Sequence, residues 1–193
     1  MTDGSAQDED ATDVRRVLAG DTGGFEGIVR RWQRRLVNLA WRFCRDRIMA
    51  EDMAQEAFVK AFRALHTYRG EAAFSTWLTA IALNSYRSTV RDRPPVAFDL
   101  DPAALRGSAP DALADMESRE RNLAVRRLVL TLPARYREAM VLYYFEEMNL
   151  AETARILGLR EGTLKARLHR GRALLRRRLV AIGISDIEPA GDG

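Results

Sequence analysis

Apolar residues recur three or four positions apart along almost the whole of this 193-residue chain, and no segment shows the alternation of a half-buried strand. This spacing places apolar side chains on one stripe of an α-helix, which must be buried against other helices. Three such stripes lie within residues 25–43, 53–65 and 74–90. Because three amphipathic helices can bury their stripes against one another, residues 14–92 are predicted to form one helical domain.

The periodicity stops in a proline-rich segment and then resumes. Residues 93–116 contain four of the six prolines of the chain. Proline cannot continue a helix interior, and the accompanying glycine, serine and aspartate are typical of a flexible linker. Helical spacing returns after this segment and continues to residue 180, so residues 117–180 are predicted to form a second helical domain. The fold class is therefore all-α, with two small helical domains joined by a flexible Pro-rich linker.

The two ends of the chain differ from these domains. Residues 1–13 carry five acidic side chains and no basic one, and we interpret this stretch as an acidic disordered tail. Residues 181–193 are interpreted as a C-terminal tail. No segment approaches the roughly 20 apolar residues of a membrane-spanning helix, and the acidic N-terminus lacks a signal-peptide pattern. A cytoplasmic protein without direct membrane insertion is the expectation.

Residue types that serve catalysis and metal binding are scarce. The single cysteine, Cys44, allows no internal disulfide and no cysteine-based zinc site, and its apolar surroundings favour buried packing. The two histidines, His66 and His169, belong to no Ser-His-Asp order, phosphate-binding glycine loop or metal cluster. We therefore expect no enzyme activity, no cofactor and no metal.

Residues 149–172 have the pattern of a helix-turn-helix. Asn149 and Glu152 are spaced as in a capping box, and Gly158 can take the left-handed conformation that ends a helix. Leu164 and Leu168 give a second helix its inward stripe, so basic residues face outward. A plain helical hairpin is the alternative, but the caps, the glycine and the basic surface together favour a helix in the major groove of DNA. The outward residues are Lys165, Arg167, His169, Arg170 and Arg172.

Residues 132–175 resemble the promoter-binding region of extracytoplasmic-function (ECF) sigma factors. The resemblance rests on Leu132-Pro133, Arg137-Glu138, Glu152 and the run Gly162–Leu168, which reads GTLKARL. Three positions depart from the family pattern, with Ala166 in place of serine, Thr153 in place of isoleucine and Glu147 where glycine is common. The resemblance implies contact with the upstream promoter element. The implied contact residues are Arg160, Glu161, Thr163, Lys165 and Arg167 at the bases or nearby backbone, and His169, Arg170 and Arg172 at phosphates.

The first predicted domain resembles the same family in a second place. Residues 50–62 are similar to the segment that binds core RNA polymerase. Asp52, Gln55 and Glu56 are spaced i, i+3 and i+4, so they share one exposed helix face. The resemblance implies that this face meets a basic coiled coil of the polymerase, although an acidic helix face is often merely solvated.

Residues 68–87 resemble the element that opens the promoter. Opening requires a site for an unstacked base, and the polar loop 66–73, backed by a rigid helix, is the predicted site. Phe74 and Trp77 lie on the apolar stripe and are predicted to belong to the core rather than to stack on bases. Asn84, Arg87 and Arg91 share a polar, basic helix face. The candidates for the downstream element are Arg69, Gly70, Glu71, Thr76, Asn84, Arg87 and Arg91.

Together these resemblances imply an ECF sigma factor, of group IV of the main bacterial sigma factors. Such a protein binds core RNA polymerase and promoter DNA, and directs recognition, melting and initiation in a stress or envelope response. The resemblance also implies a cognate anti-sigma factor, often membrane-tethered, that would cover the core-binding face or the basic helix. A dimeric DNA-binding regulator would account for the helix-turn-helix but not for residues 50–87. A protein that merely mimics a sigma factor can lose the basic DNA face, which this chain retains.

Overall fold

The computed structural model describes residues 3–91 and 124–184, and every regular element within them is a helix. The chain divides into two compact units, Met1–Val96 and Ala97–Gly193. This confirms the all-α fold with two helical domains. The predicted linker over 93–116 lies outside the described residues, as do residues 185–193 of the predicted C-terminal tail.

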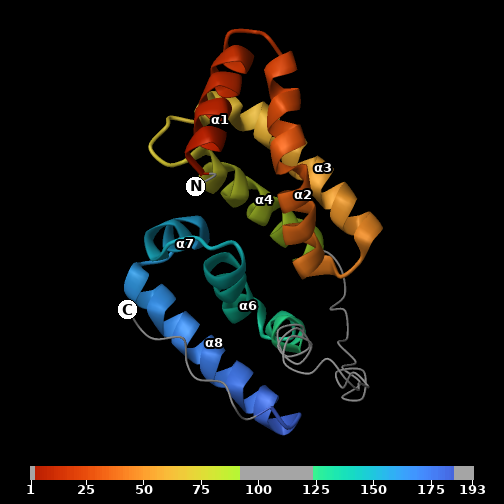
Figure 1. Ribbon diagram of the computed structural model, residues 1–193, viewed down its shortest axis with the longest axis vertical. Coiled ribbons are helices and arrows are strands. Elements are labelled where there is room, and N and C mark those ends of the chain that lie inside the picture. The colour runs from red at the N-terminus through yellow and green to blue at the C-terminus, as the bar shows by residue number, and fades with distance from the viewer. Residues whose placement is uncertain (1–2, 92–123, 185–193) are drawn as a thin grey trace. The chain divides into compact units, whose positions relative to one another are not determined.

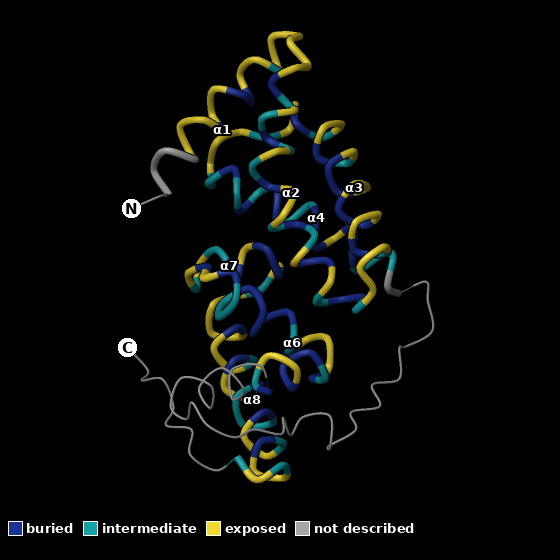
Figure 2. Tube along the Cα trace, turned by 45° about the vertical axis from the view of Figure 1, so that its right-hand side comes forward, coloured by how far each residue is buried: buried dark blue, intermediate teal, exposed yellow. Residues whose placement is uncertain are grey.

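Residues 3–91 of the N-terminal unit form four α-helices. They are α1 (Asp3–Leu18), α2 (Gly23–Cys44), α3 (Arg47–Ala64) and α4 (Phe74–Arg91), with a short 3₁₀ helix η1 (Leu65–Thr67) between the last two. Helix α2 packs against α1 and α3, and α3 also packs against α4 (Figure 1). Buried residues follow the facing sides of these helices (Figure 2), as the apolar stripes predict. The largest fully buried side chains of this unit are Ile28, Leu36, Leu39, Met53, Leu65, Leu78, Leu83 and Tyr86.

The turn between α2 and α3 is fixed by one backbone cap and one side-chain cap. Arg45 has a left-handed φ of 59°, and its N–H donates to the carbonyl of Trp41. Asp46 follows as the N-cap of α3, and its side chain accepts a hydrogen bond from the backbone N–H of Met49 at 2.8 Å. The C-terminal end of α2 and the N-terminal end of α3 therefore each gain a hydrogen bond for a backbone group that the helix itself leaves unpaired. Cys44, at the end of α2, is buried as expected.

The prediction of a disordered tail over residues 1–13 is wrong for the residues described. Helix α1 begins at Asp3 and packs against α2. The side chain of Asp10 is only 1% exposed and lies 2.9 Å from the guanidinium of Arg31. Asp10 also accepts a hydrogen bond from the indole N–H of Trp32 at 3.0 Å, and Asp13 pairs with Arg31 at 2.6 Å. The carboxylates are tolerated on the buried side of α1 because α2 supplies their partners.

The C-terminal unit is built around the packing of α6 on α8. A helical segment over 124–130 precedes α6 (Ala134–Met140), which continues into a π-helical turn, η2 (Val141–Phe145). Two further helices follow, α7 (Leu150–Leu157) and α8 (Glu161–Ala181). Gly171 allows α6 and α8 to approach closely, since a Cβ there would lie 2.9 Å from the sulfur of Met140.

Glu147, where the family pattern has glycine, occupies a left-handed backbone conformation with a φ of 54°. This conformation costs a non-glycine residue about 1–2 kcal/mol. Glu147→Gly is expected to raise the free energy of unfolding of the C-terminal unit by about 1 kcal/mol, because part of the relief is offset by the greater freedom of glycine in the unfolded chain. Urea unfolding followed by circular dichroism measures this change. The matched control is Glu161→Gly in the first turn of α8, which should lower stability; a loss of stability in both variants would contradict the explanation.

Candidate functional site

The helix-turn-helix of the C-terminal unit has the predicted caps. Asn149 Oδ1 accepts from the N–H of Glu152 at 2.9 Å, and Glu152 Oε2 accepts from the N–H of Asn149 at 3.1 Å. Helix α7 ends at Gly158, whose φ is 65°. Helix α8 begins three residues later, at Glu161. The capping box and the glycine turn are therefore confirmed.

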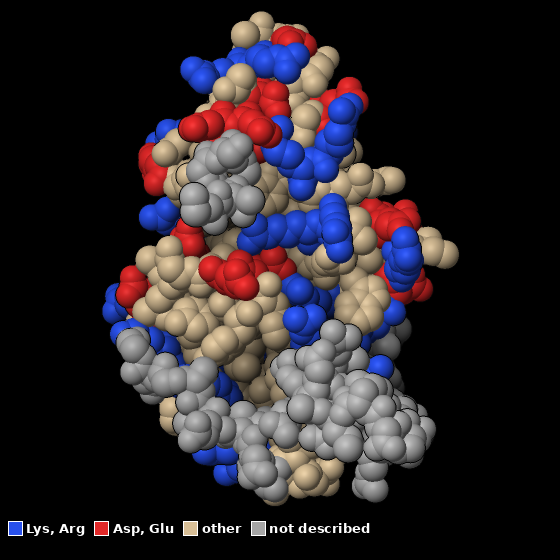
Figure 3. All heavy atoms as spheres, viewed as in Figure 1, with Lys and Arg blue, Asp and Glu red and all other residues tan. Residues whose placement is uncertain are grey.

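Helix α8 presents a basic face opposite its apolar one. Leu164, Leu168, Leu175 and Leu179 are buried, which turns the residues between them outward. Basic side chains lie along α8 in Figure 3. Arg167 and Arg172 are half-buried, and the guanidinium of Arg172 lies 3.5 Å from the hydroxyl of Tyr144. The exposed predicted contacts are Arg160, Glu161, Thr163, Lys165, His169 and Arg170.

The predicted polymerase-binding residues lie on the outer side of α3. Asp52, Gln55 and Glu56 are all exposed. The carboxylate of Glu56 pairs with the ammonium of Lys60 at 2.6 Å. Because Met53 and Ala54, between these residues, are buried, the three polar side chains share one solvent-facing surface, as the sequence predicts.

Apolar residues extend this surface in both directions along α3. Ile48 is 75% exposed, Val59 48% and Phe62 41%. We define the α3 seam as Ile48, Asp52, Gln55, Val59 and Phe62, whose alternating spacings of four and three residues place them in one line, as in a coiled coil. Phe62 lies within the apolar stripe predicted over residues 53–65, whose side chains were expected to be buried, so its exposure corrects that expectation.

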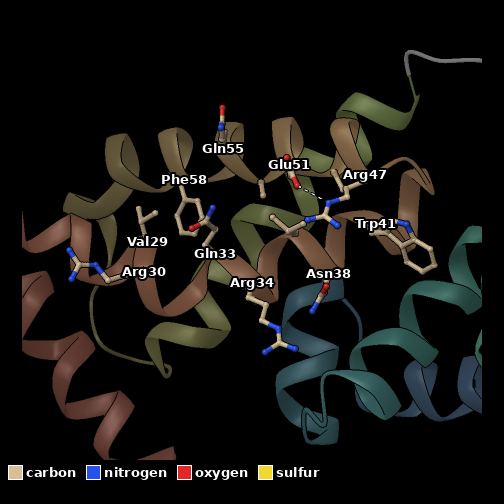
Figure 4. Close-up of a pocket in the computed structure, with 13 residues that line it drawn as sticks. Val29, Arg30, Gln33, Arg34, Asn38, Trp41, Arg47, Glu51, Gln55 and Phe58 are labelled. Carbon is tan, nitrogen blue, oxygen red and sulfur yellow. Dashed lines mark hydrogen bonds and ion pairs between the residues drawn. The ribbon is translucent and has the colours of Figure 1, made fainter.

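A groove of about 750 Å³ lies beside the seam, between α2 and α3 (Figure 4). Gln33, Asn38 and Trp41 of α2 line one side, and Gln55 and Phe58 of α3 line the other. Trp41 is 40% exposed. Since Gln55 belongs to both features, the groove and the α3 seam form a continuous surface that includes an aromatic side chain.

The loop between η1 and α4 turns three residues towards solvent. Arg69, Gly70 and Glu71 are exposed, and Gly70 has a positive φ of 73°. At the base of the loop, the hydroxyl of Tyr68 donates to the carbonyl of Ala72 at 2.8 Å. The predicted base-binding loop is thus short and closed at its base, and Tyr68 is a structural contributor that the sequence did not single out.

The predicted downstream-element residues of α4 differ in how far they are exposed. Asn84 is exposed and its side-chain oxygen lies 3.4 Å from the guanidinium of half-buried Arg87. The side chain of Arg91 lies outside the described residues. Thr76 is only 2% exposed, so its assignment to a DNA-contacting face is wrong, because this side of α4 packs inward.

The aromatic residues at the start of α4 lie where the apolar stripe places them. Phe74 is 4% exposed, which confirms its place in the core. Trp77 is half-buried, with its ring centroid 5.5 Å from that of Phe74. These two rings therefore pack against each other, and Phe74 is not available to stack on a base.

Two further properties concern the described residues alone. Within residues 3–91 and 124–184, no group of three or more His, Cys, Asp or Glu side chains could hold a metal ion. None of the helices in these ranges is both long enough and apolar enough to cross a membrane.

Two family profiles match the chain in order. Sigma-70 region 2 matches residues 28–94, and Sigma-70, region 4 matches residues 122–175. The first range includes the α3 seam, the loop and α4. The second includes α7 and most of α8.

Curated relatives match over most of their length. The RNA polymerase sigma-H factor of Pseudomonas aeruginosa is 35% identical over 176 residues, covering 86% of this chain and 91% of the relative. The ECF RNA polymerase sigma factor SigW of Bacillus subtilis is 33% identical over 176 residues, covering 86% of this chain and 94% of the relative.

Solved structures show the same fold. CnrH, in a complex with the cytosolic domain of CnrY, matches with a TM-score of 0.65 and 24% identity over 91% of this chain and 97% of that one. The sigma factor RpoE of Bartonella quintana, in a complex with the anti-sigma factor NepR, matches with a TM-score of 0.59 and 24% identity over 81% of this chain and 96% of that one.

Proposed function

This chain belongs to the ECF family of RNA polymerase sigma factors, and we propose that its two helical units divide the steps of initiation between them. The observation that carries this proposal is the order of the two matched regions, region 2 followed by region 4, on one chain. A sigma factor directs the polymerase by binding and is not itself an enzyme. We assign polymerase binding and promoter opening to residues 14–92, and upstream recognition to residues 117–180, in the cytoplasm, where the polymerase works.

We assign polymerase binding to the exposed face of α3. Asp52 and Glu56 supply negative charge, and Gln55 lies between them and can both donate and accept hydrogen bonds. Charge of one sign on a solvent-facing helix complements a basic partner and raises the rate of encounter. The expected partner is a basic coiled coil of the core polymerase.

We assign promoter opening to the loop 66–73, whose first two residues, His66 and Thr67, belong to η1, and to the adjacent polar face of α4. Arg69, Gly70 and Glu71 offer donors, acceptors and close backbone approach to an unstacked base, while Asn84 and Arg87 lie on the helix that follows. Separating a base from its stack costs a few kcal/mol, so a binding site for the extruded base stabilises the open promoter. Replacing the loop by a Gly-Ser segment should spare polymerase binding and abolish opening.

The experiment that tests this function combines two measurements on the full chain. Purified core polymerase should bind it one to one without DNA, and the resulting holoenzyme should open and transcribe promoters found by genome-wide mapping of start sites. Permanganate footprints report opening with and without the native loop. Absence of the one-to-one complex would contradict the proposed function, whereas normal melting with the replaced loop would contradict only the role given to the loop.

We assign upstream recognition to the exposed face of α8, in the major groove. Arg167→Ala is expected to change sequence preference, since a bidentate Arg–guanine contact discriminates by about 1–3 kcal/mol. Arg170→Ala is the matched change at an exposed side chain. It is expected to weaken binding to all DNA sequences alike, and to reduce the slope of log affinity against log salt concentration by about one. Binding to promoter and random DNA over a salt series measures both. Equal losses for the two variants on both DNAs would remove the distinction between base and phosphate contacts.

We also propose regulation by a cognate anti-sigma factor, which would bury the core-binding face or the basic helix. The structural neighbour RpoE was solved with an anti-sigma factor, which supports a partner of this class, membrane-tethered as such partners often are. A pull-down from the native cell should recover a protein that core polymerase displaces. Recovery of a partner that remains bound together with core polymerase would contradict occlusion.

A further inference from the structure

A tyrosine hydroxyl closes the proposed base-binding loop. Tyr68 Oη donates to the carbonyl oxygen of Ala72 at 2.8 Å, so the bond joins the two ends of the segment that presents Arg69, Gly70 and Glu71 to solvent. Phenylalanine at this position would have the same ring and could not make this bond. The hydroxyl is therefore a separable element of the loop.

The ring of Tyr68 is held in place by the start of α4. Its centroid lies 5.5 Å from that of Phe74, at an interplanar angle of 83°, and 5.4 Å from that of Trp77. Phe74 is itself buried. Edge-to-face packing of this kind fixes ring orientation, so the hydroxyl reaches the loop from a rigid support.

Helix α1 also lies close to this part of the unit. It contacts η1, the helix that immediately precedes Tyr68. Burial, with a smaller contribution from the charge of Asp10, raises the pKa of Tyr68 above its usual value. The hydroxyl therefore stays protonated at neutral pH and remains a hydrogen-bond donor.

A loop that receives an unstacked base binds it more tightly when its binding shape is already formed, because less conformational entropy is lost on binding. We propose that the Tyr68 hydroxyl is a latch that holds the loop in its base-receiving shape, which makes Tyr68 a positioning residue for promoter opening. This inference rests on the proposed role of the loop. The latch acts on capture of the base and has no part in polymerase binding.

The test uses holoenzyme reconstituted from core polymerase and the full chain. The probe is single-stranded nontemplate DNA from a promoter that this holoenzyme transcribes, with an abasic site placed at each downstream-element position in turn. The wild type should show one position where base removal weakens binding most. Tyr68→Phe should bind the intact strand about fivefold more weakly, as expected for a net hydrogen bond, and the abasic strand equally well. The base penalty, defined as the ratio of the dissociation constant for the abasic strand to that for the intact strand, should thus fall about fivefold.

Tyr86→Phe is the matched control. Its hydroxyl donates to the carbonyl of Leu36 at 3.0 Å in the core of the same unit, so its loss should lower thermal stability and leave the base penalty at the wild-type value. Both variants should bind core polymerase as the wild type does. An unchanged penalty in Tyr68→Phe, or an equal fall in Tyr86→Phe, would overturn the latch. A wild type with no sensitive position would overturn the role of the loop and the latch with it.

Discussion

Asp10→Ala is expected to lower the free energy of unfolding of the N-terminal unit by about 3 kcal/mol, because it removes one partner of a buried charged network. The indole N–H of Trp32 would lose its acceptor, and among the described residues Arg31 would keep Asp13 and the more distant Glu9. Arg31 is 23% exposed, so water can partly replace the lost carboxylate. This places the expected loss at the lower end of the range of about 3–5 kcal/mol for broken buried pairs.

Tryptophan fluorescence during urea unfolding measures this loss selectively. The three tryptophans of the chain, Trp32, Trp41 and Trp77, all lie in the N-terminal unit. Amide hydrogen exchange should show in addition that α1 opens more readily than α2 in the variant.

Two further variants identify the cause of the effect. Asp8→Ala changes an exposed carboxylate of the same helix and should alter stability by no more than about 0.5 kcal/mol. Asp10→Asn keeps an acceptor for Trp32 and should lie between the other two. Burial raises the pKa of Asp10 although Trp32 and Arg31 act in the opposite direction, so the charged carboxylate depends on these partners. Equal stability of Asp8→Ala and Asp10→Ala would refute the buried network.

The sequence predicted those parts of the fold whose signals are local. Helical spacing located α2, α3 and α4, and the capping pair Asn149 and Glu152 located the start of α7, because periodicity and caps act within a few residues. Helix α1 was missed because its acidic composition resembles a solvated tail. Asp10 can be buried only with Arg31 and Trp32, which are 21 and 22 residues away, and their proximity exists only after folding.

In the candidate sites, too, the sequence predicted the features that depend on local spacing and missed those that depend on packing between helices or on loop geometry. The faces of α3 and α8 follow from helical spacing. Their polar residues are exposed as expected, except Arg167 and Arg172 of α8, which are half-buried. Phe62 was misplaced because spacing gives the direction of a side chain, whereas the width of the buried stripe depends on the neighbouring helices. Thr76 was a candidate through the family resemblance, which does not give the burial of a side chain. The hydrogen bond from Tyr68 to Ala72 depends on loop geometry, which residue spacing does not encode.

The second large expected effect concerns polymerase binding by the exposed face of α3, which carries the α3 seam and, beside it, Glu56. The double reversal Asp52→Lys, Glu56→Lys is expected to weaken core polymerase binding at least roughly a hundredfold, since like charges placed opposite each other cost several kcal/mol. Glu56 is already paired with Lys60, so the single change at Asp52 should have the larger share. The loss should shrink as salt rises, because exposed charges are screened.

The apolar ends of the α3 seam should contribute differently. Ile48→Ala and Phe62→Ala remove exposed apolar surface, and each is expected to weaken binding about tenfold, as truncation of an interface anchor does. Their effect should lie in faster dissociation and be insensitive to salt, whereas charge reversal should slow association. Surface-immobilised core polymerase gives both rates for each variant over a salt series. Asp8→Lys, a charge reversal at an exposed position of α1, is the control that should bind as the wild type does. Unchanged affinity in the double reversal would disprove this role of α3, and unchanged dissociation in both alanine variants would confine the interface to its acidic centre.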